Sequence, residues 1–108
     1  MSTPHNQMAR IALGDTDSTV VDIGGANAVG LVIPSAFTGT SIAMYVAAKS
    51  GDTPIPLLDE LGNAVSVLVT ANTAVSFWVP DRMPWQFIQL VSDAAEAADR
   101  DILIVLKD

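Results

Sequence analysis

The sequence of 108 residues is the size of a single domain, and half of its residues are hydrophobic while only 16% are charged. Its formal net charge of −7 at pH 7 would repel a phosphate backbone, so nucleic acid is not an expected partner. The chain has no Cys for disulfides or thiolate metal sites, and no run of about 20 apolar residues that could span a bilayer.

Residues 1–7 are polar and contain neither the basic start nor the apolar run of a secretory signal. They also lack apolar periodicity, so burial cannot offset the entropy lost on ordering them. We therefore expect a flexible N-terminal arm over residues 1–7, ordered only by a partner, and one folded domain over residues 8–108.

From residue 8 onward, short runs rich in Val and Ile alternate with clusters of turn residues, a pattern typical of an all-β protein. We predict a single antiparallel β-sandwich or jelly-roll-like domain. The predicted strands are, in chain order, residues 8–13, 19–23, 28–33, 41–48, 64–70, 74–79, 85–92 and 101–107, with a short edge strand as an additional candidate at 54–58. The Ala-rich segment 92–100 is predicted to be a loop with one helical turn.

Alternation within the strands predicts which side chains face the core. In the strand at 41–48, Ile42, Met44 and Val46 share one face, which leaves Tyr45 on the other. The strand at 64–70 places its valines on the core face in the same way.

Two predicted strands, at 28–33 and 101–107, are apolar on both faces. Only one face of a sheet meets the core of a two-layer sandwich, so the second face needs a loop, a neighbouring subunit or another protein to cover it. Together with the low charge content, this pattern favours a homo-oligomer.

The sequence lacks the residue patterns of common catalytic and cofactor sites. A Ser or Thr nucleophile needs a base within hydrogen-bond reach, and the single His of the chain, His5, lies in the polar arm. The glycines Gly24, Gly25 and Gly30 do not have the spacing of a dinucleotide fingerprint and precede a strand instead of a helix. We predict that the protein is not an enzyme and has no cofactor.

Three aspartates cluster early in the chain: Asp15, Asp17 and Asp22. They do not form an EF-hand, because Val20 stands at the required Gly position and Ala26 at the bidentate carboxylate position. A looser calcium loop and a turn in which Asp side chains bond backbone amides both remain open. We assign no metal site.

A recognition surface is the remaining kind of site. Trp, Met and Arg are enriched in interface cores, and two prolines restrict the corner at residues 80–84. The candidate interface residues are Trp78, Pro80, Arg82, Met83 and Tyr45. For Trp78, core and interface positions remain open, and Arg82 is either a partner for a carboxylate across an interface or a solvated turn residue. Trp85 is predicted to pack in the core.

Several segments resemble a known family. They are Ile33-Pro34-Ser35-Ala36-Phe37-Thr38-Gly39-Thr40 with the strand that follows, the Ser50-Gly51-Asp52 turn, Leu57-Leu58-Asp59 before Gly62, and residues 85–92 and 97–107. Over residues 31–107 the chain resembles the small β-sandwich head decoration (cement) proteins of tailed bacteriophages. The motifs describe strands and turns and contain no catalytic signature, so no functional residue carries over.

The resemblance implies a virion structural protein, made in the host cytoplasm, that binds the major capsid protein on the outer surface of the capsid and stabilises the shell. Such proteins are often trimeric. The acidic charge of the chain favours the outer face over the DNA-filled lumen. An alternative is a carbohydrate- or receptor-binding module of a phage particle, with Tyr45 and Trp78 as a stacking platform. A small hydrolase is a third class, for which the chain offers no base.

Overall fold

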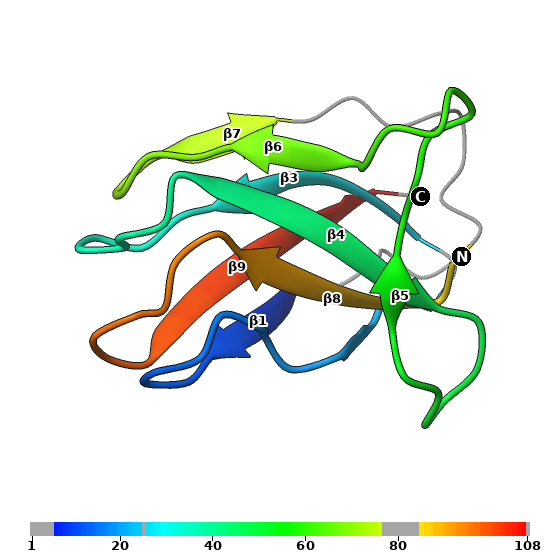
Figure 1. Cartoon of the computed structure of the whole chain (residues 1–108), viewed down its shortest axis with the longest axis horizontal. Coiled ribbons are helices and arrows are strands. Elements are labelled where there is room, and N and C mark those ends of the chain that lie inside the picture. The colour runs from blue at the N-terminus through cyan, green and yellow to red at the C-terminus, as the bar shows by residue number, and fades with distance from the viewer. Residues whose placement is uncertain (1–5, 25, 77–84, 108) are drawn as a thin grey trace.

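The computed structural model describes residues 6–24, 26–76 and 85–107, and this part of the chain is all β (Figure 1). It forms two antiparallel sheets, as the predicted β-sandwich requires. Within the described ranges, no helix is long and apolar enough to cross a membrane. The strands are β1 (Gln7–Ile11), β2 (Val21–Asp22), β3 (Asn27–Val32), β4 (Ser41–Ala47), β5 (Ile55–Pro56), β6 (Ser66–Leu68), β7 (Ala74–Ser76), β8 (Phe87–Ser92) and β9 (Arg100–Lys107).

The two sheets combine strands that are far apart in the sequence. Sheet A has the order β1-β9-β3-β7, and sheet B has the order β2-β8-β4-β5 with β6 also paired to β4. The last strand, β9, therefore lies inside sheet A between β1 and β3 (Figure 1). One edge of β4 is shared, because β5 pairs with its Tyr45 and Val46 and β6 pairs with the residues from Ser41 to Ala43.

The core lies between the sheets and follows the predicted alternation. Ile42, Met44 and Val46 of β4 are buried, and the neighbouring Tyr45 is half-buried on the opposite face. They pack with buried residues of β3, β8 and β9, mostly Ile and Leu, whose burial supplies the main driving force for folding. Trp85 is partly buried against this core, as predicted.

Several boundaries differ from the predictions. β2 is shorter than the predicted strand at 19–23, although the Ser18 and Ile23 amides still donate to carbonyls of Leu90 and Gln86. β1 begins at Gln7, one residue before the predicted start of the domain, and residues 1–5 lie outside the described part. The prediction of a helical turn within residues 92–100 is wrong, because the structure has no helix there. The backbone of this segment bonds other loops instead, since the Glu96 amide donates to the Asp15 carbonyl.

Candidate functional site

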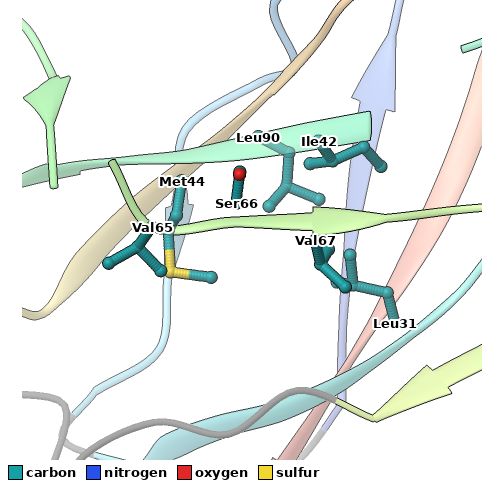
Figure 2. Close-up of a pocket in the computed structure, with 7 residues that line it drawn as sticks. All are labelled: Leu31, Ile42, Met44, Val65, Ser66, Val67 and Leu90. Carbon is teal, nitrogen blue, oxygen red and sulfur yellow. The ribbon is translucent and has the colours of Figure 1, made fainter. Parts of the chain in front are cut away.

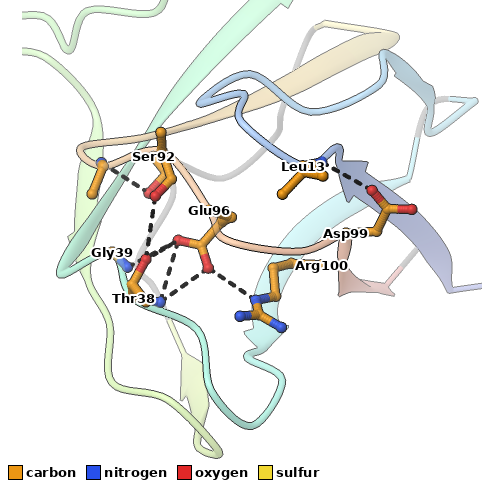
Figure 3. Close-up of polar contacts among 9 residues, drawn as sticks. Leu13, Thr38, Gly39, Ser92, Glu96, Asp99 and Arg100 are labelled. Atoms are coloured by element: carbon orange, nitrogen blue, oxygen red, sulfur yellow. Dashed lines mark hydrogen bonds and ion pairs between the residues drawn. The ribbon is translucent and has the colours of Figure 1, made fainter.

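A buried carboxylate, Glu96, joins three loops at one end of the sandwich (Figure 3). Its side chain is 0% exposed and forms an ion pair with Arg100, whose Nε lies 3.0 Å from Oε1. The Thr38 hydroxyl donates to Oε2 over 2.6 Å, and the amides of Thr38 and Gly39 donate to the same carboxylate. The Glu96 carbonyl also accepts a hydrogen bond from the Gly14 amide. We call Glu96, Arg100, Thr38 and Gly39 the carboxylate clasp.

A buried carboxylate with a perturbed pKa is a candidate catalytic group, so the protonation state of Glu96 decides whether it could transfer a proton. Burial alone would raise its pKa, but hydrogen bonds from Thr38 and Arg100 outweigh that effect and lower the pKa of Glu96 below its ordinary value. Both carboxylate oxygens have donors. Among the described residues, no buried side-chain polar atom lacks a hydrogen-bond partner. The clasp therefore fits a structural role and offers no free group for proton transfer.

Gly39 and Asp93 complete this loop junction. A Cβ at Gly39 would overlap the Ser92 hydroxyl and lie 2.9 Å from the Phe37 ring, so the loop needs glycine there. Asp93 accepts hydrogen bonds from the Thr40 and Ser41 amides, and the hydrogen bonds from Thr40 lower the pKa of Asp93. The sequence analysis missed the clasp. The sequence did contain one signal for it: Glu96 and Arg100 stand four residues apart in an otherwise Ala-rich loop, which is a spacing that allows an ion pair.

The early aspartates do not come together. Asp17 lies opposite Val91 and Asp22 opposite Phe87, four residues apart along β8, or about 13 Å. Asp22 accepts hydrogen bonds from the Gly24 amide and the Gln86 side chain, so it belongs to a turn. Asp15 and Asp17 line a shallow hollow with Gly14 and Thr16. No group of three or more potential metal ligands occurs in the part of the chain that the structure describes.

Of the five predicted interface residues, the structure places Tyr45. It lies on the outer face of sheet B, opposite Gln89 of β8 and Pro56 of β5. Trp78, Pro80, Arg82 and Met83 fall outside the described residues, so their predicted roles stay predictions.

The outer face of sheet A carries a continuous row of apolar side chains. Leu103 of β9 pairs with Met8 of β1 on one side and Val32 of β3 on the other, and Val32 pairs with Ala74 of β7. Met8 is 52% exposed and Val32 is 40% exposed. Alternate residues of β9 are buried in the core, while Leu103 and Val105 lie half-buried on the opposite face, so both faces of β9 carry apolar side chains.

Beside this row, β3 contains a bulge between Ala28 and Gly30, and Gly30 is buried. Gly30 lies opposite Val105 on β9 and Ser76 on β7. A Cβ at Gly30 would lie 3.0 Å from the Val75 carbonyl oxygen, so the close approach of β7 favours glycine.

Charged groups lie at the two ends of the same face. Arg10 donates to both carboxylate oxygens of Asp101, at 2.7 and 3.0 Å, and its guanidinium also lies 3.8 Å from Asp99. The hydrogen bond from Arg10 lowers the pKa of Asp101. Lys107 is exposed at the far end of β9. We call the residues Met8, Arg10, Gly30, Val32, Ala74, Ser76, Asp101, Leu103, Val105 and Lys107 the sheet A face.

A second exposed apolar region is the segment from β5 to β6, residues 55–68, which we call the β5–β6 arm. Leu61 is 83% exposed at its turn and Leu68 is 81% exposed in β6, while Ile55 and Leu58 are also exposed. Asp59 organises the turn, since its side chain accepts hydrogen bonds from the amides of Leu61 and Asn63. The turn thus presents Leu61 to solvent in a hydrogen-bonded backbone.

An apolar cavity of about 110 Å³ lies between the sheets, beneath β6 (Figure 2). Buried core residues form its floor. Two half-buried valines form its rim: Val67 in β6 and Val65 just before β6. The lining residues are Leu31, Ile42, Met44, Val65, Ser66, Val67 and Leu90. This lining contains no acid, base or thiol, so the cavity offers nothing for acid–base or thiol chemistry.

Comparisons of the chain with protein-family models, with curated proteins and with solved structures give no match. The candidate sites are therefore defined by their own geometry. They are two exposed apolar surfaces, the sheet A face and the β5–β6 arm, on a sandwich whose described buried polar side chains are all satisfied.

Proposed function

We propose that this protein is a non-enzymatic structural protein of a virion, a decoration or cement protein that binds the major capsid protein on the outer face of a phage head. One observation supports this proposal above the others. Among the described residues, eight large apolar side chains are exposed, and Leu61 and Leu68 of the β5–β6 arm are the most exposed of them. Protein partners bind surfaces of this kind.

The β5–β6 arm is the part we assign to capsid contact. Fully burying a Leu side chain contributes about 1.5–3 kcal/mol, so a few such anchors can dominate the binding energy of an interface. Leu61 is already held in place by the turn around Asp59, which reduces the entropy lost on binding.

Stabilisation of the capsid shell requires no catalytic step. A protein that binds the assembled shell and not its separated subunits stabilises the shell by mass action, in proportion to the number of occupied sites. The net charge of −7 favours a position on the outer surface, away from packaged DNA.

The test is to measure the copy number of this protein relative to the major capsid protein in particles of the virus that encodes it. We expect a fixed ratio, and we expect Leu61→Lys to lower it. Leu13→Lys is the matched control, because Leu13 is also exposed but lies near the clasp. Absence of the protein from heads, or an equal loss in both variants, would overturn the proposal.

A carbohydrate- or receptor-binding module is the second candidate. Tyr45 supports it, because this half-buried residue lies on the outer face of sheet B, opposite Gln89 of β8. In that case Tyr45→Ala should abolish binding to a glycan array while particle occupancy stays at the wild-type level. A decoration protein would give the opposite result, with Leu61→Lys lowering occupancy and Tyr45→Ala leaving it unchanged.

A further inference from the structure

The outer side of β9 has a symmetric arrangement of side chains. Asp101, Leu103, Val105 and Lys107 alternate along it, so two apolar residues lie between an acidic end and a basic end. Asp101 and Lys107 are six residues apart, or about 20 Å. The midpoint of this series falls at Ile104, between Leu103 and Val105.

This arrangement is complementary to itself. If two copies meet face to face with antiparallel β9 strands and a two-fold axis at the level of residue 104, each Leu103 lies over Val105 of the other copy. Each Lys107 then lies over the Asp101 end, where Asp99 and Asp101 outnumber Arg10 by one charge. The apolar centre and both charged ends are satisfied by the same rotation.

The neighbouring strand β3 fits the same rotation. Val32 lies at the level of Leu103 and Gly30 at the level of Val105. The two-fold axis therefore places the exposed Val32 side chain of one copy over Gly30 of the other, a buried position that carries no side chain. In the same way, Ala74 of β7 in one copy lies over Ser76 of the other copy, and both side chains are small.

We propose that the sheet A face binds a second copy of this chain in an isologous, face-to-face dimer. Only β9 and β3 approach a length of about 20 Å, since β1 has five residues and β7 three, so a strand spacing of about 4.8 Å gives a contact of less than about 400 Å² per copy. Stable interfaces bury about 800 Å² per partner, so this dimer is weak and depends on concentration. The contact requires no capsid and is independent of the function proposed above.

Sedimentation equilibrium of the purified full-length protein, from 5 µM to about 1 mM, tests the proposal. The weight-average mass of the wild type should rise toward twice the monomer mass. Leu103→Lys should keep the protein monomeric over the whole range, although it makes the chain less acidic. Leu68→Lys makes the same change at an exposed position of sheet B and should associate like the wild type.

A second pair of variants tests the charged ends. Lys107→Glu and Lys49→Glu both change the net charge from −7 to −9, so they raise general repulsion equally, and both lysines are exposed. Lys107→Glu should weaken dimerisation at least tenfold more than Lys49→Glu does. Circular dichroism of each variant confirms that the β fold is kept.

Three results would overturn the proposal. They are a wild type that stays monomeric at 1 mM, equal effects of the two Leu variants, and equal effects of the two Lys variants. A monomeric wild type in which Leu103→Lys lowers capsid occupancy would assign the face to the capsid protein instead.

Discussion

At one end of the sandwich, loops distant in sequence are joined through the buried Glu96, whereas at the other end the turn of the β5–β6 arm exposes Leu61 (Figure 1). The first end directs its polar groups inward, where each has a partner. The second directs apolar groups outward, where they are exposed to solvent. The difference separates residues that maintain the fold from residues available to another molecule, and it predicts opposite effects of mutation at the two ends.

The largest effect is expected from Glu96→Gln. Removing one member of a buried ion pair costs about 3–5 kcal/mol, because Arg100 and the Thr38 donors lose their charged partner. For a domain of this size the loss corresponds to a decrease in Tm of roughly 10–20 °C. Calorimetry measures it. Glu60→Gln, the same change on the exposed turn of the β5–β6 arm, is the control and should shift Tm by little.

A smaller loss is expected from Gly39→Ala. The added methyl group would overlap the Ser92 hydroxyl and crowd the Phe37 ring, and overpacking of this kind costs about 1–3 kcal/mol. Urea unfolding should show a lower midpoint. The double variant Gly39→Ala/Ser92→Ala removes the overlapping oxygen and should recover part of the loss. If it recovers none, the loop is limited by another contact.

Acidification should distinguish the clasp from other carboxylates. The pKa of Glu96 in the folded state is lower than its ordinary value of 4.5, so its contribution to stability is complete above that pH and is lost as the pH falls through the folded pKa. Below pH 4.5 the stability of the wild type should therefore decrease more steeply than that of Glu96→Gln. Parallel curves for the two proteins would contradict a charged Glu96.

The smallest effect on folding is expected at the exposed end. Leu61→Ser should change the free energy of unfolding by less than about 0.5 kcal/mol, because the side chain is 83% exposed and contributes little to the core. Chemical denaturation measures this change. A large destabilisation would place Leu61 in the fold and remove it from the proposed contact surface.

Much of the fold was predictable from the sequence because strands have a period of two. The alternation of Ile42, Met44 and Val46 against Tyr45 identified the buried face of β4 without knowledge of its neighbours. The apolar residues on both sides of β9 were also visible in the sequence, and they predicted that one face of its sheet would carry exposed or half-buried apolar side chains.

The clasp was not predictable in the same way. Glu96 is buried because Thr38, far away in the sequence, supplies its donors. No local pattern encodes such a contact. The helical turn expected near Glu96 was wrong for the same reason, since backbone groups in that segment bond the loop at residues 14 and 15. Local propensity gave way to tertiary hydrogen bonds.

The central place of β9 in sheet A also has a consequence for biosynthesis. Among the described residues, β1 has no partner in sheet A, and β3 has only the three residues of β7, until residues 100–107 have been added between them. A nascent chain that ends earlier can pair β4 with β8 and β3 with β7, but it leaves β1 unpaired in sheet A and the second edge of β3 open. Chains that lack β9 therefore expose unpaired strand edges, which favours aggregation. Chains that end before residue 100 and after residue 107, each tethered to the ribosome by a linker long enough to clear the exit tunnel, should differ sharply in their resistance to protease.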